Sequence, residues 1–137
     1  MASSTLGSSV CILMPTYNNA GTLGDVLDRV LAHAEGHVIV VDDGSTDGTP
    51  EILARRSGIT VLRHAPNRGK GFSLRTGFEK ARSLGYATAI TIDSDGQHDP
   101  ADLPAMARAV AEHPSAIVMG ARNMDQSDVP GRSSFGN

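Results

Sequence analysis

The sequence predicts an α/β fold, a Rossmann-like, doubly wound and mostly parallel sheet. Short apolar runs, nearly continuous in Val, Ile and Leu, recur along the chain, as in strands that are covered on both faces. Stretches whose apolar residues follow the helical i, i+3, i+4, i+7 spacing stand between these runs. Strands that alternate with helices in this way are joined by right-handed crossovers, which make neighbouring strands parallel.

Five strands are expected, at residues 10–14, 37–41, 60–62, 87–92 and 116–119. The first run contains Cys11, the only cysteine of the chain. A thiol in an apolar strand is expected to lie in the core. A single cysteine excludes an internal disulfide, which favours a reducing compartment.

Amphipathic helices are expected between the strands. Two of them follow a regular apolar stripe, the first through Leu23, Val26, Leu27, Val30 and Leu31 and the last through Leu103, Met106, Ala107, Val110 and Ala111. Another is expected over residues 70–84, with Leu74, Phe78 and Ala81 directed inward and Gly85 ending it.

Acidic residues mark two helix starts. Asp47 is expected to cap a short helix that runs through Ile52 and Leu53. Asp99 is expected to cap the last helix, with Pro100 as its first residue.

Composition excludes some classes of function. The 137 residues carry a net charge of −3 and have a pI near 5.9, which argues against a nucleic-acid partner, since such proteins present a basic face. Residues 1–9 are Ser-rich, are expected to be flexible and lack the pattern of a signal peptide. Because no run approaches the ~20 apolar residues of a membrane span, we expect a cytoplasmic protein. Any membrane association would be peripheral, at the cytoplasmic face, or would use a segment outside this chain.

Polar clusters follow all five expected strands, at residues 15–18, 42–47, 67–71, 93–97 and 120–122. The carboxyl ends of parallel strands share one edge of the sheet, where doubly wound folds bind their ligands. Loops are polar in any protein, but five such clusters in succession predict a binding site at this edge.

A metal site is predicted after the fourth strand. Asp93 and Asp95 flank one serine, and two carboxylates held this close favour a divalent cation between them. Oxygen ligands favour Mg²⁺ or Mn²⁺, which take further ligands from water and a diphosphate. Gln97 can add a neutral oxygen. A turn and helix cap is the alternative, but Asp99 is better placed for the cap.

Phosphate binding is predicted at residues 67–71, of sequence NRGKG, where Arg68 and Lys70 stand in a Gly-rich turn that opens a helix. The alternative for these two cations is a solvated surface pair. No Walker loop is present, and no Gly-x-Gly-x-x-Gly follows the first strand, which argues against a dinucleotide oxidoreductase. Asp42 and Asp43 end the second strand, where a nucleobase edge or ribose hydroxyl can supply the donors that buried carboxylates need.

Taken together, these clusters and their order resemble family 2 glycosyltransferases of the GT-A fold, over about residues 10 to 135. The sequence NRGKG followed by DSDGQH looks most like the polyprenyl-phosphate (dolichol-phosphate) mannosyl- and glucosyltransferases. The resemblance implies inverting, metal-dependent transfer of a hexose from a GDP- or UDP-linked sugar to an acceptor such as polyprenyl phosphate. Residues 10–122 would then be the nucleotide-sugar-binding half of the fold.

The resemblance also implies roles at matching positions. Pro15, Tyr17 and Asn18 would line the nucleoside pocket, with Asp42 on the base and Asp43 beside it. Arg68 and Lys70 would face the base or the diphosphate, and Asp93 would serve both the nucleotide sugar and the metal. The metal set would be Asp93, Asp95 and Gln97, with Mg²⁺ or Mn²⁺ as cofactor. Asp95 and Arg122 would be catalytic, and Arg122 with Arg132 would contact phosphate groups of donor or acceptor.

The sequence departs from the family pattern at its end. Residues 123–137 look like the start of an acceptor-binding region that is cut short. We therefore expect donor binding without turnover, and dimerisation, aggregation or a mobile tail from about Asn123 onward.

Two alternatives remain open: a non-catalytic nucleotide-sugar-binding module, and a sugar-1-phosphate nucleotidyltransferase. The latter ranks low because the Gly-rich signature that it needs after the first strand is absent.

Overall fold

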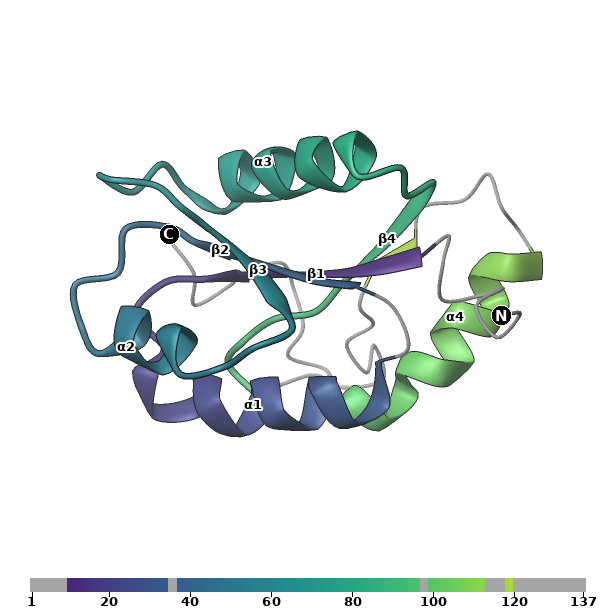
Figure 1. The fold of residues 1–137 in the computed structure, drawn as a ribbon, viewed down its shortest axis with the longest axis horizontal. Helices are drawn as coiled ribbons and strands as arrows, with labels where there is room; N and C mark the ends of the chain where they lie inside the picture. The colour runs from purple at the N-terminus through teal and green to yellow at the C-terminus, as the bar shows by residue number, and fades with distance from the viewer. Residues whose placement is uncertain (1–9, 35–36, 97–98, 113–117, 120–137) are drawn as a thin grey trace, which may run out of the picture.

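A computed structural model describes residues 10–34, 37–96, 99–112 and 118–119. Its sheet contains β1 (Val10–Thr16), β2 (His37–Asp42), β3 (Ile59–Arg63), β4 (Thr88–Thr91) and β5 (Val118–Met119). All neighbours are parallel, in the order β3-β2-β1-β4-β5, and Figure 1 shows the twisted sheet nearly edge-on. The predicted parallel sheet is confirmed. β1 is two residues longer than expected because Pro15 and Thr16 continue the pairing with β2.

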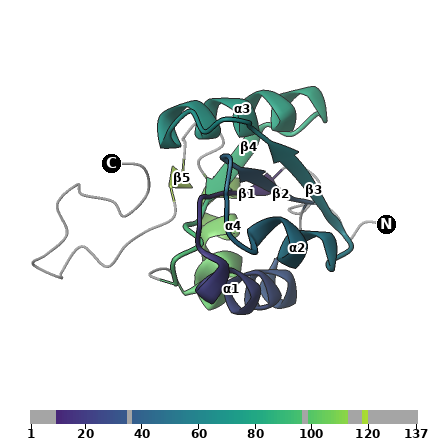
Figure 2. The ribbon, with the colours of Figure 1, turned by 90° about the vertical axis from the view of Figure 1, so that its left-hand side faces the viewer.

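Helices cover both faces of the sheet. Figures 1 and 2 show α1 (Ala20–His33), α2 (Thr49–Ala54) and α4 (Leu103–Glu112) on one face and α3 (Lys70–Ser83) on the other. The chain starts at β1, moves outward to β3, and returns over α3 to β4 on the other side of β1. The strand order therefore reverses between β1 and β4, which is where a doubly wound sheet opens a crevice for ligands.

The core is divided between the two faces by the two-residue period of the strands. Ile12 and Met14 of β1 pack toward α1, whereas Cys11 and Leu13 pack toward α3. Cys11 is fully buried, as expected, and burial raises the pKa of its thiol to about 11 because the thiolate would lose its hydration.

α3 packs closely on the sheet through small residues. Its buried residues are Ser73, Gly77 and Ala81, spaced four apart. A Cβ on Gly77 would lie 2.1 Å from Cδ1 of Leu13, so a larger residue fits there only if Leu13 or the helix shifts. The expectation that Phe78 faces inward is wrong: its side chain is 37% exposed, because the small residues occupy the contact line. Leu74 and Ala81 do pack inward, and Gly85 follows the helix end with φ +94°.

The last helix begins as predicted at its cap but with a different first turn. The Asp99 carboxylate accepts a hydrogen bond from the Ala101 N–H at 3.0 Å. Residues Pro100–Asp102 form a 3₁₀ turn before α4, with the Leu103 N–H donating to the Pro100 carbonyl. Pro104 has no N–H to donate four residues back, so the first turn closes with a three-residue bond.

The N-cap of α2 is Gly48, one residue after the predicted Asp47, but Asp47 supports the starts of both α2 and α1. Its carboxylate accepts from the N–H groups of Thr49 at 2.9 Å and Ala20 at 3.1 Å. Partial burial acts to raise the pKa of Asp47, but the hydrogen bonds from Thr49 and Ala20 outweigh it and the pKa is lowered. Within the described part of the chain, no helix combines the length and apolar character needed to cross a membrane.

Candidate functional site

The polar clusters that follow β1 to β4 gather at the carboxyl edge of the sheet. Figure 2 views the molecule from this side. Residues 17–19, 43–48, 64–69 and 92–96 form the edge, and hydrogen bonds between these loops tie them together. The site predicted from the strand ends is therefore one contiguous region.

Asp42 lies at the end of β2 with 1% of its surface exposed. Its carboxylate accepts from the Ser45 N–H at 3.0 Å and from the Arg63 guanidinium. Arg63 also donates to the Ser45 carbonyl at 3.0 Å. A buried carboxylate is tolerated because a cation and a backbone donor compensate its charge.

Asp43 is fully buried and holds the turn of residues 67–71 in place. Its Oδ1 contacts His64 Nδ1 at 2.7 Å and accepts from the Arg68 N–H at 2.8 Å, and its Oδ2 accepts from the Gly69 N–H at 2.8 Å. An ionised carboxylate only accepts, so His64 carries its hydrogen on Nδ1. Its Nε2 lies 2.9 Å from the Thr76 hydroxyl of α3. His64 thus links β2, β3 and α3.

His64 is a site residue that the sequence did not reveal. The pairing of Asp42 with Arg63 places Asp43 and His64 side by side where β2 and β3 end. A histidine directly after one strand and an acid directly after its neighbour are the available signal, but they become a pair only once the register is known.

The turn of residues 67–71 leads into α3, and its two cationic side chains, Arg68 and Lys70, contact different partners. Arg68 stacks on the Phe72 ring, with its guanidinium carbon 4.9 Å from the ring centre. Lys70 Nζ lies 3.0 Å from Asp93 Oδ1. Gly44 allows the neighbouring loop to approach closely: it has φ +80°, and a Cβ there would lie 2.7 Å from the Asn67 nitrogen.

Ser94, the middle residue of the Asp-x-Asp pattern, fixes the pattern in the fold. It is 1% exposed, and its hydroxyl donates to Thr16 at 2.9 Å and accepts from the Asn19 amide at 2.8 Å. The flanking carboxylates, Asp93 and Asp95, are half-buried at the edge of the sheet. The structure therefore anchors the serine and presents the two acids.

The residues present fit a hard divalent cation. Asp93 and Asp95 offer carboxylate oxygens, and such cations usually take only one or two carboxylates from the protein together with water and substrate phosphates. Among the residues that the structure describes, no group of three or more acidic, His or Cys side chains could hold a metal ion. The predicted third ligand, Gln97, lies outside the described residues, as do Arg122, Arg132 and the regions 1–9 and 123–137.

The loop after β1 is tied to the loop after β2. Asn18 has φ +51°, donates its N–H to Ser45 Oγ at 2.9 Å and accepts from the Thr46 N–H at 2.7 Å. Pro15 is buried within β1 opposite Val41, and Tyr17 is half-buried. The predicted nucleoside residues are therefore contiguous with Asp42, but Pro15 belongs to the sheet.

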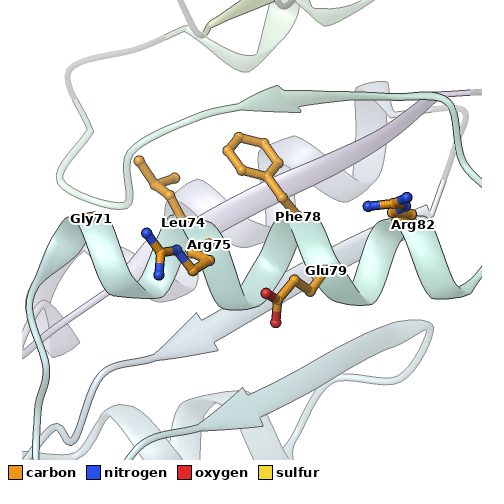
Figure 3. A pocket seen from close by; sticks show the side chains of 6 residues that line it. All are labelled: Gly71, Leu74, Arg75, Phe78, Glu79 and Arg82. Atoms are coloured by element: carbon orange, nitrogen blue, oxygen red, sulfur yellow. The ribbon is translucent and has the colours of Figure 1, made fainter.

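A hollow of about 330 Å³ lies along the flank of α3. Figure 3 shows Leu74 and Phe78 on the same side of the helix, with Arg75 and Glu79 beside them. The hollow begins at Gly71, next to the carboxyl edge, and the partly exposed Phe78 lines it.

Comparison with known proteins agrees with the fold. The chain is 34% identical to the polyprenol monophosphomannose synthase of Mycolicibacterium smegmatis over 72% of its own length and 40% of that protein. It is 33% identical to the undecaprenyl-phosphate mannosyltransferase of Micrococcus luteus over 84% of its own length and 49% of that protein. The chain thus spans about half the length of these relatives or less.

A solved structure shares the fold. The mannosyltransferase PcManGT from Pyrobaculum calidifontis, in complex with GDP-Man and Mn²⁺, superimposes with a TM-score of 0.61 at 28% identity. The match covers 74% of this chain and 31% of that one. The profile of glycosyl transferase family 2 matches residues 11–134, nearly the whole sequence. The chain therefore belongs to glycosyl transferase family 2.

Proposed function

We propose that this protein supplies the donor half of an inverting, metal-dependent glycosyltransferase that moves a hexose from a GDP- or UDP-linked sugar to polyprenyl phosphate. The observation that carries the proposal is the Asp-x-Asp pattern, which buried Ser94 pins to β1 beside Lys70. The named relatives act on polyprenyl or undecaprenyl phosphates, and the PcManGT structure contains GDP-Man and Mn²⁺, which supports the substrate class.

The donor would lie along the carboxyl edge of the sheet. Tyr17 and Asn18, with the buried Pro15 beneath them, would line the nucleoside side, and Asp42 would face the base. Asp43 would support this site by holding the turn of residues 67–71, whose Arg68 and Lys70 would meet the base or the diphosphate.

The reaction needs charge stabilisation more than proton transfer. A phosphate oxygen of the acceptor forms a new bond to the anomeric carbon while the bond from that carbon to the diphosphate breaks, and the electron pair leaves with the diphosphate. The acceptor phosphate is already ionised, so a general base is not required. Bound Mg²⁺ or Mn²⁺ would act as a Lewis acid toward the diphosphate. Asp93, Asp95 and Gln97 would hold this ion, and Arg122 and Arg132 would contact acceptor or donor phosphate.

Donor binding is tested with GDP and UDP, each with and without Mn²⁺, by thermal shift and calorimetry. A ligand that binds the folded state raises its stability in proportion to affinity. One nucleotide should bind in the presence of Mn²⁺, and Asp95→Asn should abolish the part of binding that depends on the metal. Asp102→Asn, an exposed acid in the 3₁₀ turn, is the matched control. Unchanged affinity of Asp95→Asn would contradict the metal assignment.

Transfer requires a second measurement because the chain spans about half of its relatives. The 137-residue chain should bind the donor without transferring sugar to polyprenyl phosphate. A chain extended to the length of its relatives should transfer, at the cytoplasmic face of a membrane. Robust transfer by the 137 residues alone would show that they already contain the acceptor site, contrary to this proposal. If the longer chain binds the donor but does not transfer, the alternative of a non-catalytic nucleotide-sugar-binding module is favoured.

A further inference from the structure

The ion pair between Lys70 and Asp93 bridges two elements of the site. Lys70 is the first residue of α3, and Asp93 follows β4. Nζ and Oδ1 are 3.0 Å apart, and the side chains are 28% and 17% exposed. The carboxylate predicted to bind a metal therefore already has a cation beside it.

This pair is more exposed than the buried acids described at the same edge. Asp42 and Asp43 are at most 1% exposed and accept from backbone N–H groups as well as from a side chain. Asp93 is paired with an ammonium group on a flexible four-carbon chain, and both side chains are in partial contact with water. A lysine can leave such a partner by rotating its side chain, whereas a backbone donor is fixed by the fold.

We propose that Lys70 competes with the divalent cation for Asp93 and transfers to the diphosphate of the donor when the nucleotide binds. This inference rests on the proposed function. An ammonium group and a divalent cation repel each other, so Lys70 weakens metal binding in the absence of nucleotide. Diphosphate oxygens offer the ammonium a new anionic partner at the start of α3 and leave Asp93 to the metal.

The consequence is that metal and nucleotide bind cooperatively through Lys70. If the lysine leaves Asp93 when either ligand binds, each ligand removes an obstacle to the other. Coupling between two equilibrium binding events is reciprocal, so the nucleotide must raise the affinity for metal by the same factor that the metal raises the affinity for nucleotide.

The test compares Lys70→Met with Lys80→Met, because both lysines belong to α3 and only Lys70 is near Asp93. Free Mn²⁺ is measured by electron paramagnetic resonance, and GDP and UDP binding by calorimetry with and without saturating Mn²⁺. Lys70→Met should bind Mn²⁺ alone about 5-fold more tightly and the nucleotide with Mn²⁺ about 10-fold more weakly, a size typical of coupling between two sites.

Lys80→Met controls for a general effect of losing a lysine from α3, and Lys70→Arg separates the charge from the side chain that carries it. Lys80→Met should leave both affinities unchanged, and Lys70→Arg, which keeps the charge, should retain weak binding of Mn²⁺ alone. If Lys70→Met binds Mn²⁺ no more tightly than the wild type, the inference is wrong even though donor binding stands. If the wild type binds neither GDP nor UDP with Mn²⁺, the proposed function fails and this inference falls with it.

Discussion

Gly77 decides how closely α3 lies on the sheet, and replacing it by alanine tests that packing. A Cβ at this position would lie 2.1 Å from Cδ1, 2.8 Å from Cδ2 and 3.0 Å from Cγ of Leu13. Carbon atoms normally approach to about 3.5–4 Å. Leu13 is fully buried between β1 and α3, so either its side chain leaves its preferred rotamer or the helix moves outward.

Two opposing effects set the size of the change. Alanine is favoured over glycine inside a helix by about 1 kcal/mol. Overfilling a packed core costs about 1–3 kcal/mol, and an overlap this large lies at the upper end. Gly77→Ala should therefore lower the free energy of unfolding by about 1–2 kcal/mol.

Urea unfolding of a double-mutant cycle measures the conflict directly. Leu13→Ala alone should cost about 2–5 kcal/mol. In that background Gly77→Ala should stabilise by about 1 kcal/mol, because the obstructing methyl groups are gone. The interaction energy between the two substitutions is then about 2–3 kcal/mol.

Gly71→Ala is the matched control, since it lies in the same helix and a Cβ added there would meet nothing within 4 Å. It should be neutral or stabilising by about 0.5 kcal/mol. If Gly77→Ala is as stable as the wild type, Leu13 yields without cost and close packing does not require glycine at this position. Nucleotide affinity adds a second readout, because outward movement of α3 would displace Lys70, whereas rotation of Leu13 would not.

Three further outcomes follow from the described contacts. His64→Leu should lower the free energy of unfolding by about 2 kcal/mol, since it removes a donor from the buried Asp43. His64→Asn, whose amide can donate, should recover most of this stability and of the affinity for GDP or UDP. Equal loss in both variants would contradict the donor role. Asp47→Ala should cost about 1 kcal/mol of unfolding free energy, because the N–H groups of Thr49 and Ala20 at the two helix starts lose their acceptor. Because the pKa of Asp47 is lowered by folding, the wild-type advantage should be full above the ordinary carboxyl pKa and fade as the pH falls. A pH-independent difference would argue against this role. Cys11, whose folded pKa of about 11 exceeds its ordinary 9.0, should resist alkylation in the folded protein. Its contribution to stability should be present below pH 9 and be lost as the pH rises toward 11. Rapid labelling of the native protein, detected by mass spectrometry, would show that the core opens at Cys11.

Much of the fold is local in the sequence. The two-residue and 3.6-residue periods each belong to one segment, so the strands, helix caps and the end of α3 at Gly85 could be predicted without tertiary information. The common edge of the polar clusters followed as well, because alternating strands and helices make a parallel sheet whose carboxyl ends coincide. This is why Asp42, Arg68 and Asp95 were predicted to lie on one side, as they do.

Tertiary structure decided which side chains meet within that edge. The pairing of Asp43 with His64 depends on the register of β2 and β3, and that of Lys70 with Asp93 depends on the crossover that lays α3 over the sheet. The partial exposure of Phe78 depends on the separation between α3 and β1, because a helix that packs through glycine excludes its larger neighbours from the contact line. These contacts join segments that are far apart in the chain. The periodicity of a single segment therefore contains no information about them.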